Sequence, residues 1–198
     1  MRGSLDEYRQ KRDFRKTPEP DADGSDGNDR RWVIQKHDAS SLHYDFRLEV
    51  DGVLVSWAVP KGPSTDPSEK RLARPTEDHP LDYIDFEGVI PDGEYGAGTV
   101  MVWDTGTYEN LTEDDDGGEK PMAEALEDGH ASFRLEGEKI SGGYALTRIG
   151  SGDDERWLLV KMDDEEADAR RNPVSTEPDS VKTGRSLEEI AEEEGDGS

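Results

Sequence analysis

The sequence LHYDFRLEV-DG-VLVSWAV, residues 42–59, indicates the fold class of this chain. Apolar and polar side chains alternate strictly over residues 42–50, which is the period of a β-strand with one buried face. Asp51 and Gly52 form a dipeptide typical of tight hairpin turns, and residues 53–59 provide the returning strand. The stretch therefore predicts a β-hairpin whose apolar face belongs to a core.

Further β-rich segments flank this hairpin at residues 31–37, 84–90, 98–104, 106–110 and 131–162. We expect one short helix at residues 121–129 and a Pro-rich loop from residue 60 to about residue 75. About eight short strands at close spacing favour an all-β fold, a small closed or partly open β-barrel with one or two short helices.

The ends of the chain differ in composition from this β-rich part. We expect residues 1–30 to form a flexible basic arm followed by an Asp- and Gly-rich linker, residues 31–162 to form the barrel, and residues 163–198 to form an acidic, largely disordered tail. Within the tail, Ser186 and Glu189 form a capping-box pattern that favours a short helix.

The composition restricts the class of protein. Hydrophobic residues make up only 30% of the chain, cysteine is absent and the net charge is −25. No apolar run approaches the ~20 residues of a membrane-spanning helix, and the first residues lack the apolar stretch of a signal peptide. We therefore expect a soluble, cytoplasmic protein, and acidity spread over the whole chain favours a halophilic source over an ordinary acidic protein.

The polar face of strand 42–50 carries an unusual set of side chains. His43, Asp45 and Arg47 follow one another on that face, about 7 Å apart. Imidazole and carboxylate groups suit Mn²⁺, Zn²⁺ or Fe²⁺, and a neighbouring guanidinium suits a phosphate oxygen. His37 is close enough in an antiparallel arrangement to be a third ligand. Spacing alone also fits a facial-triad iron oxygenase or a chance cluster.

Three more polar residues occur in the loops that follow. Lys61 lies in the string VPKGPS. Arg71 and His79 lie in the string RLARPTEDHPLDY. In isolation each is compatible with an ordinary loop residue, but His79 near an open metal position would suit a phosphate donor or a general acid. The Gly-rich run FEGVIPDGEYGAG, residues 86–98, could present backbone N–H groups to a phosphate, although hairpin turns alone would explain it.

Four longer strings make the pattern more specific: HDASSLHYDFRLE, SWAVPKGPS, EDHPLDYIDFEGVIPDGEYGAG and VWDTGTY. They closely resemble the 3′-phosphoesterase domain of bacterial DNA ligase D, and the resemblance extends from Arg12 to about Met162. It implies a β-barrel with a Mn²⁺-dependent site, for which Co²⁺ or Zn²⁺ are alternative metals. The implied activity removes a 3′-terminal ribonucleoside by phosphodiester cleavage and then the 3′-phosphate, leaving a 3′-OH end for DNA repair by non-homologous end joining.

The resemblance also implies roles for individual residues. His37, His43 and Asp45 would bind the metal, while Arg47 and His79 would contact the scissile phosphate, with His79 as general acid. The other matched positions are Lys61 and Arg71 in the catalytic set, and Gln35, Ser56, Glu77, Tyr83, Arg12, Asp13 and Glu19 in the substrate-binding set.

The expected partners are 3′ ends of DNA or of RNA/DNA primer–templates, together with a DNA ligase and a polymerase that act on the same ends. We expect a monomer. The sequence has no Lys-centred nucleotidyl site, so ligation would be the work of another protein. A non-catalytic DNA-end-binding module is the alternative function.

Overall fold

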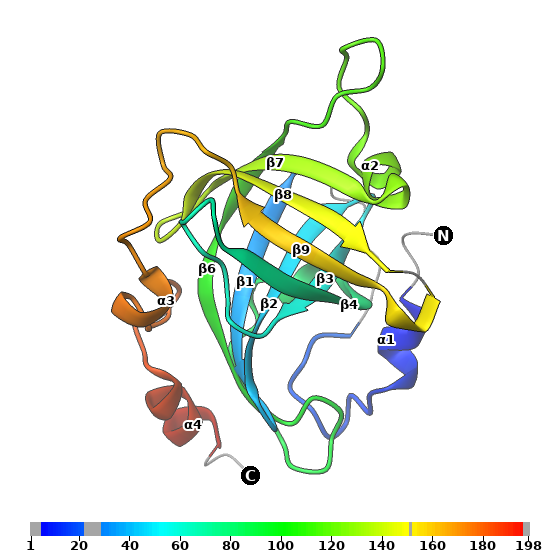
Figure 1. Cartoon of the computed structure of the whole chain (residues 1–198). Helices are drawn as coiled ribbons and strands as arrows, with labels where there is room; N and C mark the ends of the chain where they lie inside the picture. Colours follow the sequence, from blue (N-terminus) through cyan, green and yellow to red (C-terminus); the bar gives the residue numbers. More distant parts are fainter. Residues whose placement is uncertain (1–4, 22–28, 151, 196–198) are drawn as a thin grey trace.

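The computed structural model describes residues 5–21, 29–150 and 152–195. Eight of the strands in these residues close into an antiparallel β-barrel (Figure 1), which confirms the predicted fold class. Around the barrel the order is β1 (Arg31–Asp38), β2 (Leu42–Val50), β3 (Val53–Val59), β4 (Lys70–Pro80), β9 (Arg156–Lys161), β8 (Ser141–Ile149), β7 (His130–Glu136) and β6 (Gly98–Asn110), and β6 pairs back with β1. A ninth strand, β5 (Gly88–Ile90), extends the sheet beside β6.

The apolar face of the hairpin forms the centre of the barrel core. Phe46 on β2 pairs with Trp57 on β3, and its ring also packs on Phe133 of β7 at a centroid distance of 5.7 Å. Trp32 and Trp157 are fully buried as well. Each large apolar side chain contributes roughly 1.5–3 kcal/mol by leaving water. Because the side chains of β2 alternate, its polar residues lie on the outer wall.

The structure differs from the expected strand pattern after the hairpin. Residues 70–80, which lie wholly within segments expected to be loops, form β4, which pairs with β3 and β9. Pro75 is opposite Trp57, and a register shift occurs between Leu54 and Ser56. Residues 98–110 form one strand rather than two, and residues 84–90 divide between a 3₁₀ helix, η1 (Leu81–Asp85), and β5. The helix expected at residues 121–129 is α2 (Met122–Asp128).

The described part of the N-terminal arm packs on the barrel beside β4. Its helix α1 (Asp6–Gln10) buries Tyr8 completely, and the Tyr8 hydroxyl donates a hydrogen bond of 2.5 Å to the carbonyl of Pro20. Most of the expected linker, residues 22–28, lies outside the described residues.

Residues 163–195, which the composition led us to expect as a largely disordered tail, contact the barrel in the structure. They contain α3 (Pro173–Thr176) and end in α4 (Leu187–Gly195). The 3₁₀ helix η2 (Gly152–Asp154) lies earlier in the chain, before β9. Trp103 of β6 donates a hydrogen bond to the Glu177 carbonyl, and Ile190 of α4 is fully buried. The predicted capping box is formed: the amide of Ser186 donates to the Glu189 carboxylate, and the amide of Glu189 donates to the Ser186 hydroxyl. In Figure 1 these helices lie on the opposite side of the barrel from α1.

Candidate metal and phosphate site

A cavity of about 300 Å³ opens on the outer wall of the barrel, where β1, β2, β3 and β4 lie side by side. Register brings its polar groups together: His37 pairs with His43, and Asp45 lies between Gln35 and Ala58 on the neighbouring strands. The cavity is lined by Arg12, His37, Ala39, His43, Asp45, Arg47, Ala58, Thr76, Glu77, His79, Tyr83, Ile90, Tyr95 and Gly96.

His37, His43 and Asp45 form a compact group whose potential ligand atoms all lie within 4.8 Å of one another. The Nε2 of His37 lies 2.7 Å from the carbonyl of Gly96, and the Nδ1 of His43 lies 3.1 Å from the carbonyl of Ser41. A carbonyl only accepts hydrogen bonds, so each of these nitrogens carries the proton. In the neutral imidazoles the lone pairs are then on His37 Nδ1 and His43 Nε2.

These two lone pairs face the same carboxylate. His37 Nδ1 lies 3.4 Å from Asp45 Oδ2, and His43 Nε2 lies 3.2 Å from Asp45 Oδ1. Three electron-rich atoms around one space repel each other unless a cation lies between them. Carbonyl groups that fix the tautomers of two histidines are also the usual outer contacts of metal-bound imidazoles. The donor set therefore fits a divalent metal.

The charge of Asp45 is stabilised although the residue is almost fully buried. Burial favours the neutral carboxyl, but the Arg47 guanidinium, 3.5 Å away, and the two imidazoles outweigh it and hold the pKa of Asp45 far below its usual range. Burial also lowers the pKa of His43, but contact with Asp45 outweighs this and raises it. A proton and a cation thus compete for the same position.

Arg47 is held beside this group by residues behind the cavity. Its Nε donates a hydrogen bond of 2.7 Å to Gln35 Oε1, and Gln35 Nε2 donates to the carbonyls of Tyr83 and Phe86. The guanidinium carbon lies 5.0 Å from the centre of the Tyr83 ring. Gln35 therefore fixes the plane of a buried cation next to the metal-binding group.

His79 lies between two arginines. Its Nδ1 is 2.9 Å from the Glu77 carbonyl and 3.2 Å from Arg47 Nη1, and its Nε2 is 3.4 Å from Arg12 Nη2. Burial, together with the positive charges of Arg47 and Arg12, lowers the pKa of His79 well below its ordinary value. This environment favours the neutral imidazole of His79.

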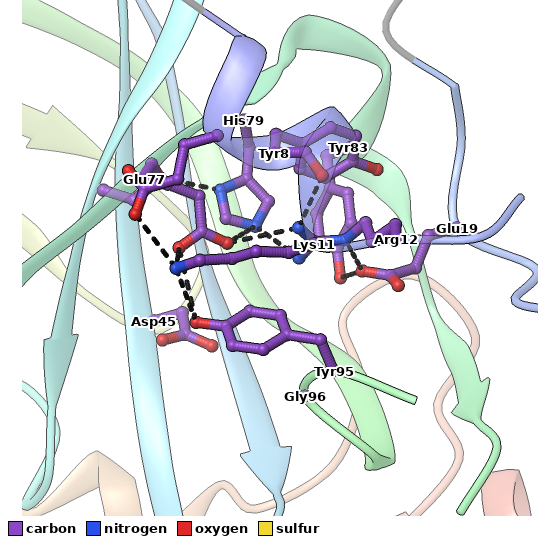
Figure 2. A network of polar contacts seen from close by, with 12 residues as sticks. Tyr8, Lys11, Arg12, Glu19, Asp45, Glu77, His79, Tyr83, Tyr95 and Gly96 are labelled. Atoms are coloured by element: carbon purple, nitrogen blue, oxygen red, sulfur yellow. Dashed lines mark hydrogen bonds and ion pairs between the residues drawn. The ribbon is translucent and has the colours of Figure 1, made fainter. Parts of the chain in front are cut away.

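The N-terminal arm forms one wall of the cavity (Figure 2). Arg12 lies 2.9 Å from Glu19 and 3.2 Å from Glu77, all three side chains being almost fully buried. Glu19 also accepts a hydrogen bond of 2.6 Å from the Tyr83 hydroxyl. Lys11 extends towards Glu77 and the ring of Tyr95, so residues far apart in sequence surround His79.

The predicted site residues separate into three groups in the structure. Those at the cavity surface are His37, His43, Asp45, Arg47, His79, Glu77, Tyr83 and Arg12. Gln35 and Glu19 lie behind it as supports, and Ser56 is buried with its hydroxyl donating to the Leu54 carbonyl. Lys61, Arg71 and Asp13 do not line it: Lys61 is exposed, Arg71 lies 3.6 Å from Glu69, and Asp13 pairs with Arg15.

Sequence reasoning missed Tyr95, Gly96 and Lys11. The sequence predicts that the Gly-rich run containing Tyr95 and Gly96 could present backbone N–H groups to a phosphate. In the structure this run instead contributes the Gly96 carbonyl and the Tyr95 ring to the cavity. The polar residues of the arm gave no periodic signal that would relate Lys11 to a cavity.

Fold and site together define a class: a closed antiparallel β-barrel whose outer wall presents a His–His–Asp group that could hold a metal, beside buried cations suited to an anion. Residues 35–148 match the family model for the DNA Ligase D 3′-phosphoesterase domain. The chain belongs to this family, as its resemblance predicted.

Three relatives illustrate the match. The chain is 52% identical over 189 residues to a multifunctional non-homologous end joining protein LigD from Pseudomonas aeruginosa, covering 92% of this chain and 22% of that protein. It is 50% identical over 160 residues to the corresponding DNA repair protein of Mycobacterium tuberculosis and 46% over 167 residues to that of Mycolicibacterium smegmatis, covering 80% and 81% of this chain and 20% and 21% of those proteins. The chain thus spans about a fifth of the length of these relatives. Within its described residues, no helix is long and apolar enough to cross a membrane.

Proposed function

We propose that this chain is a Mn²⁺-dependent 3′-phosphoesterase that removes a 3′-terminal ribonucleoside and then the remaining 3′-phosphate, leaving a 3′-OH end. Membership of the family supports 3′-end processing in non-homologous end joining. The observation that carries the finer proposal is the convergence of the His37, His43 and Asp45 ligand atoms beside the buried pair Arg47 and His79.

The metal would be held by His37 Nδ1, His43 Nε2 and Asp45. A bound divalent metal supplies a Lewis acid for a phosphoryl oxygen and lowers the pKa of a coordinated water. Mixed imidazole and carboxylate donors suit Mn²⁺, and Co²⁺ and Zn²⁺ accept the same donors. Three protein ligands leave coordination positions for water and substrate.

Arg47 would bind the non-bridging oxygens of the scissile phosphate. Its guanidinium keeps one fixed orientation because Gln35 accepts from its Nε. A donor that is already oriented stabilises negative charge developing on phosphate oxygens without reorganising during the reaction. The buried position strengthens this interaction, since water is excluded around it.

His79 would protonate the leaving oxygen in the diester step. The two arginines that disfavour a proton on His79 are neutralised when an anionic phosphate binds between them, so its pKa rises with substrate in place. The imidazole would then take up a proton and donate it to the leaving oxygen. Arg12 would couple the arm to this step, because it contacts both His79 and Glu77.

The substrates we propose are primer–template or broken DNA ends, and a ligase and a polymerase would act on the same ends. The printed name of the Pseudomonas aeruginosa relative, a multifunctional end-joining protein, supports this context. Buried arginines beside the His–His–Asp group favour a phosphoester over the substrates of an iron oxygenase.

A primer–template with one 3′-terminal ribonucleotide tests the proposal. With Mn²⁺ we expect the primer to shorten to a 3′-phosphate and then to a 3′-OH end, and His43→Ala to lose at least about 100-fold in rate, since even outer contacts of metal ligands are worth 10–100-fold. His130→Ala is the matched control, because His130 is an exposed histidine on β7. Binding of the duplex without shortening would instead favour the non-catalytic end-binding module.

A further inference from the structure

A row of side chains on the outer wall leads away from the metal-binding group. Cross-strand pairing runs from Asp45 on β2 to Ala58 on β3 and then to Arg74 on β4. Neighbouring strands are about 4.8 Å apart, so Arg74 starts about 10 Å from Asp45. Between them the wall carries only the small side chains of Ala58 and Thr76, which also line the cavity. Arg74 does not itself line the cavity, but it follows in the row directly after Ala58, a small residue that does.

A second arginine lies next to the end of this row. The β4–β9 ladder ends at the pair Ala73 and Trp157, so Arg74 and Arg156 are the next residues on either strand. Ala73 and Trp157 are fully buried in the core. By strand alternation both arginines are on the outer face. Like charges at facing positions of a sheet are destabilising, so a structural role does not explain this pair.

Arg74 has no ion pair within the described part of the chain, and Arg156 has one long ion pair with an exposed partner. Arg74 is exposed, and its side chain forms no ion pair or hydrogen bond within the described part of the chain. Arg156 reaches only the exposed carboxylate of Asp154, at 3.7 Å, and its Nε has no acceptor among the described residues. By contrast, Arg134 on the far wall of the barrel pairs with Glu166. The Nε of Arg156 is buried, so the donors open to a ligand are the Arg74 guanidinium and the Nη groups of Arg156. They lie on a chain whose net charge is −25.

We infer that Arg74 and Arg156 bind the sugar–phosphate backbone of the nucleic-acid strand whose 3′ end enters the cavity, an inference that rests on the proposed function. The planar guanidinium matches phosphate oxygens in a bidentate manner. A distance of about 10 Å corresponds to roughly three phosphates of one strand, at 3.4 Å of helix axis each. The subsite thus selects a polynucleotide over a mononucleotide and contacts it a few residues from its end.

The test compares Arg74→Ala, Arg156→Ala and the double variant with Arg134→Ala. Arg134 is the matched control, because it is an outward-facing strand arginine on β7, away from the cavity. Fluorescence anisotropy of a labelled primer–template duplex at several KCl concentrations gives Kd and its salt slope. Hydrolysis of the duplex and of p-nitrophenyl phosphate gives kcat/KM for a long and a small substrate. Thermal unfolding shows whether each variant is folded.

We expect the double variant to weaken duplex binding by about tenfold and each single variant to reduce the salt slope by about one. The ratio of kcat/KM for the duplex to that for p-nitrophenyl phosphate should fall in the same variants and not in Arg134→Ala. Wild-type Kd and salt slope in the double variant, or an equal loss in Arg134→Ala, would overturn the inference. Absence of hydrolysis of both substrates by the wild type would reject the proposed function instead, while an Arg74-dependent Kd would still support the subsite.

Discussion

Replacing Arg12 with alanine is expected to release the N-terminal arm from the barrel. Arg12 is the cation shared by Glu19 and Glu77, at 2.9 Å and 3.2 Å, and all three side chains are at most 4% exposed. Its guanidinium also lies 4.0 Å from the centre of the Tyr8 ring. The substitution leaves Glu19 without the Arg12 cation, leaves Glu77 with Lys11 at 3.4 Å, and removes the cation–π contact.

The expected loss follows from this burial. Removing one partner of a buried ion pair costs about 3–5 kcal/mol, because the remaining charge is uncompensated. The arm is joined to β1 through a short segment, so it can undock while the barrel stays folded. The loss is then limited to the docking free energy of the arm and appears as local opening. If the arm and barrel instead unfold together, Tm falls by about 2–4 °C per kcal/mol.

Limited trypsin digestion and thermal unfolding measure both outcomes. Arg15→Ala is the matched control, because Arg15 lies three residues away, pairs only with Asp13 and has a side chain that is 90% exposed. We expect cleavage within residues 5–21 to accelerate in Arg12→Ala. In Arg15→Ala the bond after residue 15 is no longer a trypsin site, and the remaining bonds of the arm should be cleaved at the wild-type rate. Equal cleavage rates and equal Tm values in the two variants would refute the reasoning.

Two further predictions concern the rest of the fold. Ile190→Ala should lower the free energy with which α4 docks on the barrel by about 2–5 kcal/mol, because Ile190 is fully buried, and should accelerate amide hydrogen exchange in α4. Glu188→Ala, at an exposed position, is the control. Equal exchange rates in the two variants would contradict the packing of α4. Burial lowers the pKa of Lys139 to about 8. The folded state then binds fewer protons than the unfolded state between about pH 8 and 10.4, so the free energy of unfolding should rise with pH in this window. Lys139→Met should weaken that rise in urea unfolding, whereas the same rise in both proteins would contradict the burial argument.

The barrel could be predicted from the sequence where local patterns are strong. The alternation of residues 42–50 and the turn at Asp51 and Gly52 gave the hairpin with its observed bounds. The strand β4 was not predicted, because Pro75 and the charged residues around it are typical of a loop. It is a strand because β3 and β9 both pair with it, and such long-range pairing is not visible in local sequence.

The proximity of His37, His43 and Asp45 was predictable for a similar reason. His43 and Asp45 lie on one strand face, so their proximity follows from period-two geometry. The proximity of His37 to them follows from the pairing of β1 with β2. The tautomer of His37 depends on the Gly96 carbonyl, which belongs to a loop that sequence spacing could not position. Contacts of the arm and of residues 163–195 with the barrel likewise depend on tertiary structure alone. The halophilic interpretation of the charge stays a prediction.

The central claim, that His37, His43 and Asp45 hold the catalytic metal, is tested most directly by Mn²⁺ titration of chelator-treated protein, with 3′-end hydrolysis followed in the same samples. The account predicts one tight Mn²⁺ per chain, with hydrolysis rising in parallel with occupancy in the wild type and in His130→Ala. In His43→Ala both the tight binding and the hydrolysis should be lost. Full hydrolysis without bound metal, or unchanged Mn²⁺ affinity in His43→Ala, would contradict the account.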